Sequence, residues 1–109
     1  MSKVLFANSG SEANDLAIKI IWYYNNALGR PEKKKIISRN RAYHGITVAT
    51  GSLTGLPPIH DDFDLPIDPI LHTDCPHYSP GAEAGETEAD FARPFAEKCE
   101  KMNPEQCPE

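Results

Sequence analysis

The sequence predicts an α/β fold in which an incomplete, mostly parallel sheet is flanked by helices. An apolar run at residues 3–7 is followed by a helical pattern over 10–28 and by a second apolar run over 34–38. Short connections link these segments, and a strand–helix–strand unit places its strands in parallel with a right-handed crossover. A parallel sheet normally needs helices on both faces. The few elements expected here cannot supply them, so the sheet is expected to be incomplete.

The first helix is expected over residues 10–28. Its apolar residues recur at steps of one, three and four, which places most of them on one face. Ser9 and Glu12 match the S-x-x-E capping box at the helix start. Gly29 follows the last apolar residue and Pro31 comes two positions later, a combination that ends a helix.

The second half of the chain is expected to be less regular. The pattern over 46–53 permits a short helix, although Thr47, Val48 and Thr50 disfavour it. Residues 57–86 carry most of the prolines and are expected to form a long extended loop. Such a loop is unusual in a small compact domain and indicates packing against something outside this chain.

An acidic helix is expected over residues 87–102. Phe91, Phe95 and Cys99 are spaced at i, i+4 and i+8, which places them on one helical face. Pro94 lacks an amide hydrogen and indicates that the helix could begin later than Thr87.

Composition excludes several classes of partner. The chain has 109 residues and a formal net charge of −5, which disfavours non-specific nucleic-acid binding. Its basic run, 33–35, is interpreted as a solvated strand start. No apolar run reaches the ~20 residues of a membrane span. Three irregularly spaced cysteines do not predict a disulfide framework, and together these features favour the cytoplasm.

A possible phosphate site lies at the start of the first helix, in the segment 8–15. Gly10 allows a ligand to approach the backbone, and Ser9 and Ser11 add hydroxyl donors. The amide groups at a helix N-terminus point outward, where the helix dipole favours an anion. The alternative interpretation is an ordinary capped helix without a ligand.

A second motif follows the strand expected at 34–38. Tyr43 or His44 could stack on a planar ring, with Gly45 allowing a tight turn, although an exposed turn is the alternative. Both motifs follow strand ends, and parallel strands end on the same edge of a sheet, where α/β proteins bind ligands. Together they predict a site for a flat, phosphorylated cofactor.

The segment 4–15, taken together with Arg41-Ala42-Tyr43-His44-Gly45, resembles class III aminotransferases, the ω-aminotransferase or amine–pyruvate group. Residues 17–19, 22–24 and 72–78 extend the resemblance over essentially the whole chain. These are pyridoxal 5'-phosphate enzymes of fold type I. The resemblance implies that the chain is an internal part of the large α/β domain.

The resemblance also assigns roles to individual residues. Gly10 and Ser11 would bind the cofactor phosphate through their amides, with the hydroxyls of Ser9 and Ser11 beside them. Tyr43 would stack on the pyridine ring, and His44 and Gly45 would shape the same wall. On this basis residues 1–56 form a cofactor-binding part, 57–86 a proline-rich loop and 87–102 a helix.

The implied reaction moves an amino group from a primary amine or ω-amino acid to a keto acid such as pyruvate, in a homodimer. In the family, a lysine forms a Schiff base with the cofactor and an aspartate holds the pyridine nitrogen protonated. Both lie beyond the residues matched here. No catalytic residue is therefore assigned, the chain is expected to be about a quarter of a family enzyme, and it is expected to be inactive alone.

Other interpretations stay open. One is a small, non-catalytic phosphate- or nucleotide-binding α/β module, and another is a truncated product that does not fold alone. A zinc site is a weaker alternative because its ligands would be irregularly spaced; they would come from His72, Cys75, His77, Cys99 and Cys107. The acidic residues 61–64 are interpreted as a solvated loop.

Overall fold

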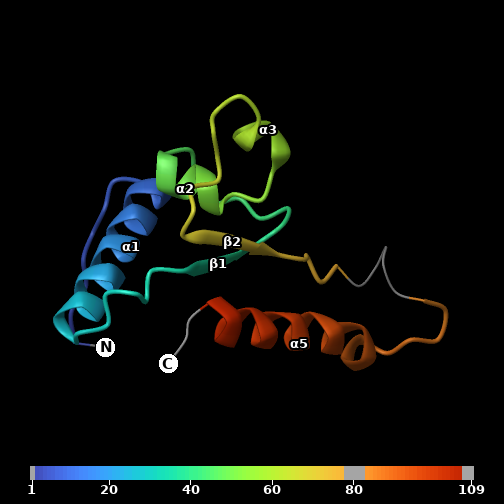
Figure 1. Ribbon diagram of the computed structural model, residues 1–109. Coiled ribbons are helices and arrows are strands. Elements are labelled where there is room, and N and C mark those ends of the chain that lie inside the picture. Colours follow the sequence, from blue (N-terminus) through green and yellow to red (C-terminus); the bar gives the residue numbers. More distant parts are fainter. Residues whose placement is uncertain (1, 78–82, 107–109) are drawn as a thin grey trace.

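A computed structural model describes residues 2–77 and 83–106 (Figure 1). Its elements, in chain order, are α1 (Gly10–Ala27), β1 (Ile36–Arg39), α2 (Val48–Leu53), α3 (Pro57–His60), β2 (Ile70–Thr73) and α5 (Glu88–Gln106). In Figure 1 the two strands lie at the centre, with α1, α2 and α3 grouped toward one side and α5 along the other. The predicted α/β class with an incomplete parallel sheet is confirmed.

The parallel pair is formed by β1 and β2, with Ile36 opposite Ile70 and Arg39 opposite Thr73. The predicted pairing of residues 3–7 with 34–38 is wrong. Residues 2–7 form no strand, and Phe6 is 89% exposed. An apolar run becomes a strand only when a neighbour accepts its hydrogen bonds. Within the described residues, neither strand of the sheet pairs with this segment.

Helix α1 is confirmed almost residue for residue. Ser9 is the N-cap, and its hydroxyl accepts from the amide of Glu12 at 3.1 Å. The capping box is incomplete, because the carboxylate of Glu12 accepts from the amide of Asn8 at 2.8 Å rather than from Ser9. At the other end Gly29 has a φ of 72°, the left-handed conformation that commonly follows a helix.

The basic run between α1 and β1 has a structural role. The Nζ of Lys34 donates to the carbonyl of Trp22 at 3.3 Å and to the side chain of Asn26 at 2.5 Å. The indole of Trp22 donates back to the Lys34 carbonyl at 3.0 Å. A cation near a helix C-terminus is favoured by the dipole. Lys34 therefore fixes the path from α1 into β1 and is more than a solvated charge.

The segment 57–86 contains more structure than the predicted loop. It includes the one-turn helix α3 and the strand β2, whose Ile70 is buried. Prolines are tolerated there because Pro57 opens α3, where an amide hydrogen has no intrahelical partner, and Pro69 directly precedes β2. Whether 1–56, 57–86 and 87–102 behave as separate units stays a prediction.

The predicted acidic helix is confirmed as α5, which begins at Glu88 and continues to Gln106. The hydroxyl of Thr87 accepts from the amide of Asp90 at 3.2 Å and so caps the start. Pro94 lies inside the helix instead of delaying it. Phe91 and Phe95 contact each other with ring centroids 5.2 Å apart, as their spacing predicts.

The buried apolar core is small. Ile18, Leu53 and Ile70 are its buried members, and Trp22 and Ile67 are among the partly buried residues that pack around them. The radius of gyration is 16.2 Å, compared with about 13 Å expected for a compact domain of this length. This open arrangement matches the expectation that part of the packing surface belongs to something else. No described helix has the length and apolar character needed to cross a bilayer.

Candidate cofactor-binding site

The first part of the candidate site is the N-terminus of α1. The first amide groups of a helix have no intrahelical partner. The Ser9 hydroxyl takes the amide of Glu12, which leaves those of Gly10 and Ser11 for a ligand. Gly10 is exposed, and a Cβ there would meet no atom within 4 Å. The backbone at this position is therefore open to close approach by an anion.

The second part is the turn after β1, and hydrogen bonds attach it directly to α1. The Nδ2 of Asn14 donates to the carbonyl of His44 at 3.0 Å. The hydroxyl of Ser11 accepts from the amide of Ile46 at 3.4 Å. Farther along α1, Asp15 accepts from the hydroxyl of Thr47 at 2.9 Å. The two motifs predicted to meet do lie together, although the predicted strand before α1 is absent.

Gly45 is the tightest point of this contact. It is buried with a φ of 135°, a conformation that side chains rarely adopt. A Cβ at this position would overlap the hydroxyl oxygens of Ser11 and Thr50. Glycine is therefore required for the turn to reach the helix. The sequence predicted a tight turn here but did not predict which atoms it would meet.

The contact between residues 9–11 of the α1 start and the turn at 43–47 is called the corner below. Tyr43 lies in this turn, and its side chain is 63% exposed to solvent. Within the described ranges its ring makes no ring contact and its hydroxyl no hydrogen bond. His44 is half-buried, and its backbone is held on both sides. An exposed ring on a fixed backbone can cover a flat ligand. Assignment of Ser9, Gly10, Ser11, Tyr43, His44 and Gly45 to cofactor binding stays a prediction.

Sequence reasoning missed the residue that holds the turn from behind. Thr54 is fully buried; its Oγ1 accepts from the amide of His44 at 2.9 Å and lies 3.0 Å from the carbonyl oxygens of Gly45 and Thr50. Thr50 and Ser52 are also fully buried and hydrogen-bonded. Thr47 and Thr50 were expected to disfavour a helix over 46–53, but their hydroxyls cap α2, and that of Thr47 also donates to Asp15 of α1. The signal available in the sequence was a run of small hydroxyl residues directly after the aromatic motif.

The donor set fits pyridoxal 5'-phosphate in two respects. Open amides at a helix N-terminus suit a phosphate, and the exposed ring of Tyr43, one residue before His44, suits a planar heterocycle. The described contacts of this corner include no lysine. The described contacts of the corner therefore supply no amine that could form a covalent bond with the cofactor.

The zinc alternative gains no support from the described residues. No group of three His, Cys, Asp or Glu side chains there could hold a metal ion. The Nε2 of His72 lies 3.2 Å from the Leu53 carbonyl, and the Sγ of Cys99 lies 3.7 Å from the Thr73 hydroxyl. Cys107 lies outside the described residues, as does Tyr78.

The fold places the chain among α/β proteins with a parallel sheet, and comparison with known proteins narrows the class. A family model described as aminotransferase class III matches residues 1–107. The chain is 59% identical over 109 residues to a probable gamma-aminobutyrate transaminase 4 of Oryza sativa subsp. japonica, covering 100% of this chain and 23% of that protein. It is 55% identical over 109 residues to a vanillin aminotransferase of Capsicum chinense, covering 100% of this chain and 24% of that protein.

A solved structure agrees. The omega transaminase of Pseudomonas jessenii in complex with PMP superposes with a TM-score of 0.89 at 57% identity, covering 94% of this chain and 23% of that one. This chain therefore belongs to the class III aminotransferase family, whose members use pyridoxal 5'-phosphate and have fold type I. It spans less than a quarter of these relatives' lengths.

Proposed function

We propose that this chain supplies the phosphate-binding and ring-covering part of the cofactor site of a class III aminotransferase. The complete reaction would transfer an amino group from a primary amine or ω-amino acid to a keto acid such as pyruvate. Support comes from the family match over residues 1–107 and from relatives named as gamma-aminobutyrate and vanillin aminotransferases. The amine donor and the keto acid are part of this proposal.

The observation that carries the proposal is the contact between α1 and the turn at Gly45. The missing side chain at Gly45 allows the turn to reach Ser11, and Asn14 bonds the carbonyl of His44. These contacts connect the residue before His44, Tyr43, to the amides of Gly10 and Ser11. They support the proposal that a phosphate donor set and an aromatic platform share one corner of the fold.

Each residue of this corner would have a separate task. The amides of Gly10 and Ser11 would hold the phosphate, aided by the α1 dipole. Tyr43 would cover one face of the ring and exclude water from it. When bound, pyridoxal 5'-phosphate acts as an electron sink for the carbon attached to the transferred nitrogen. Covalent attachment would need a lysine from outside these contacts.

The first test is turnover by the chain alone. Purified chain is mixed with pyridoxal 5'-phosphate, an amine donor and pyruvate, and alanine is measured against free cofactor. We expect no alanine above that control, because the described contacts of the corner include no lysine. Measurable excess alanine would contradict the proposal that turnover needs a lysine from outside these contacts.

The second test restores the missing context. Residues 1–109 replace the matching segment of the Pseudomonas jessenii omega transaminase, and alanine formation and bound cofactor are measured. We expect the chimera to retain cofactor and activity, and its Tyr43→Ala variant to lose cofactor at lower dilution than Tyr43→Phe. A folded chimera that holds no cofactor would overturn the proposal.

A second candidate function rests on the open amides of Gly10 and Ser11, which need no lysine to bind an anion. The chain would then be a non-catalytic phosphate- or nucleotide-binding module. Titration with pyridoxal 5'-phosphate and with a nucleotide distinguishes the two. Tighter binding of the nucleotide than of pyridoxal 5'-phosphate would favour the module.

We also propose a homodimer in the cytoplasm for the complete protein. The exposed apolar residues of the N-terminal segment and α1 support a larger assembly; among them are Val4, Leu5, Phe6, Ile20 and Tyr23. Some relatives are named as mitochondrial or chloroplastic. Sedimentation of the purified complete protein tests the dimer, and fractionation of cells that produce it tests the compartment. A monomer or an organellar fraction would contradict the corresponding part.

A further inference from the structure

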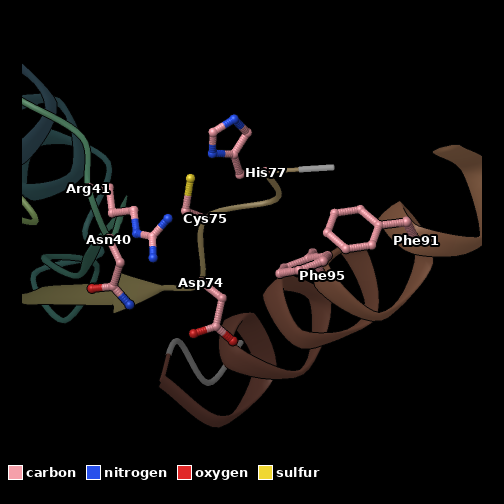
Figure 2. A pocket seen from close by; sticks show the side chains of 7 residues that line it. All are labelled: Asn40, Arg41, Asp74, Cys75, His77, Phe91 and Phe95. Atoms are coloured by element: carbon pink, nitrogen blue, oxygen red, sulfur yellow. The ribbon is translucent and has the colours of Figure 1, made fainter. Parts of the chain in front are cut away.

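A pocket lies between the carboxyl ends of β1 and β2 and the first turns of α5, with a volume of about 500 Å³ (Figure 2). This volume is within the usual range of small-molecule sites, about 300–1,000 Å³. Its lining comes from the ends of both strands and from α5, and it includes none of the residues 9–11 or 43–45. The carboxyl ends of parallel strands are where α/β proteins bind ligands. The pocket is separate from the proposed cofactor corner.

The charge in this pocket is dominated by Arg41. The carboxylate of Asp74, which also lines the pocket, lies 2.5 Å from the Nζ of Lys98 and is neutralised by it. Among the described residues no carboxylate forms an ion pair with Arg41. Figure 2 shows the guanidinium of Arg41 on the strand side of the pocket, beside Cys75. The pocket therefore offers a cation to a ligand.

The backbone holds Arg41 in place. Its φ is 67°, an uncommon conformation for a residue with a side chain. The amide of Arg41 donates to the Gly55 carbonyl at 2.7 Å, and the Gly55 amide donates to Ala42 at 2.8 Å. Uncommon backbone conformations held by surrounding bonds are frequent at binding sites. Here they fix where the Arg41 side chain leaves the sheet edge.

The opposite wall is apolar and aromatic. Phe91 and Phe95 lie on consecutive turns of α5, both half-buried, and their rings are inclined by 47°. Figure 2 shows both rings on the α5 side, across the pocket from Arg41. Two inclined rings present faces and edges to which a third ring can pack.

We propose that this pocket binds a small carboxylate that carries an aromatic ring. The planar guanidinium of Arg41 matches a carboxylate through paired N–H donors. The ligand's ring would pack on Phe91 and Phe95. Neither half of the pocket suffices alone, since an exposed cation binds simple anions weakly and the apolar wall has no means of orienting a ligand. This inference goes beyond the proposed aminotransferase function and does not depend on it.

The test is a calorimetric titration of the 109-residue chain at constant ionic strength with three probes. Phenylacetate has both groups, phenylacetamide lacks the charge, and acetate lacks the ring. We expect phenylacetate to bind at least about tenfold more tightly than either of the others. Amide NMR shifts should map to the ends of β1 and β2 and the first turns of α5. Equal binding of phenylacetamide, or no binding of phenylacetate, would overturn the proposal.

Variants separate the site from general charge effects. Arg41→Gly removes the guanidinium and suits the φ of 67°, so the fold should be retained while phenylacetate binding falls about tenfold. Arg41→Asn, which also tolerates this φ, should behave alike. Arg30→Gln removes the same charge from the exposed turn after α1 and should leave binding unchanged. Unchanged binding in both Arg41 variants would overturn the assignment.

Two further measurements test the aromatic wall of the pocket and the location of the bound probe. Phe95→Leu keeps an apolar side chain but removes a ring, and about threefold weaker phenylacetate binding is expected. Phenylacetate should leave the amide NMR shifts of Gly10 and Ser11 unchanged, because these residues lie outside the pocket lining. Shifts confined to Gly10 and Ser11 would place the probe at the cofactor corner and contradict the proposal.

Discussion

The two sides of the sheet are held by different kinds of contact. On the side of α1 and α2, the turn at residues 43–47 is fixed by buried hydroxyls and by hydrogen bonds with α1. On the side of α5, an exposed ion pair between Lys98 and Asp74 and a 3.7 Å contact from Cys99 accompany the pocket described above. The contacts on the first side fix the geometry of the turn, whereas the second side contains an open pocket.

The difference indicates how strongly the contacts on each side contribute to stability. Buried hydrogen bonds are costly to break because each leaves a polar group without water. Exposed ion pairs contribute little, because solvent screens them. Substitutions on the α1–α2 side should therefore have large effects on stability, and those on the α5 side small ones.

Gly45→Ala should have the largest effect. A Cβ would overlap Ser11 and Thr50, and the φ of 135° is unfavourable for alanine. We expect a loss of about 3 kcal/mol in the free energy of unfolding, measured with urea. Gly10→Ala is the matched control, because no atom lies near its Cβ, and it should change stability by no more than about 0.5 kcal/mol. Equal effects of the two would contradict the tight contact.

Thr54→Val should come next. Valine has the shape of threonine but no hydroxyl, so the amide of His44 would lose its partner. We expect a loss of about 2 kcal/mol in the same measurement. Thr54→Ser keeps the hydroxyl and should be the milder change. If serine proved as damaging as valine, packing of the methyl group rather than the hydrogen bond would hold the turn.

Asn14→Ala removes the bond to the His44 carbonyl and should cost about 1 kcal/mol, since water can reach part of this group. Amide hydrogen exchange at Gly45 and Ile46 should accelerate as well. Asn25→Ala, whose side chain bonds within α1 on the surface, serves as the comparison. Faster exchange at the turn in both variants would show a general loss of stability instead of a local one.

Lys98→Met on the α5 side should have the smallest effect. It breaks the exposed pair with Asp74, so about 0.5 kcal/mol is expected at low salt. The difference should vanish in 1 M salt, where the screening length is about 3 Å. Lys101→Met is the control, because Lys101 forms no ion pair with any residue that the structure describes. A large, salt-independent loss for Lys98→Met would mean that the two sides do not differ as proposed.

The elements that the sequence predicted well are those set by local signals. Helix α1 has Ser9 at its start and Gly29 after its end, and α5 has an apolar spacing that survives the internal Pro94. Strand pairing was predicted wrongly, because residues 3–7 carry a strand-like pattern but no partner within the described chain. A pattern of side chains cannot say which neighbour will accept the backbone hydrogen bonds.

The site shows the same division. Gly10, Ser11 and Gly45 were identified as parts of one corner from motif chemistry and from the resemblance. Thr54 was not, because a buried hydroxyl behind a turn has the same appearance in sequence as a surface one. The pocket beside Arg41 was also missed, since its wall comes from α5, fifty residues farther along the chain.

Because Gly45 has no side chain, the residues allowed at position 45 depend on the residue at position 11, and the reverse also holds. Ser11 fills the space that a residue larger than glycine would take at position 45, so neither can be enlarged unless the other yields. A library that randomises residues 9–11 alone would discard most bulky choices at position 11 for steric reasons unrelated to ligand affinity. Laboratory evolution of this corner should therefore mutate positions 11, 45 and 50 jointly.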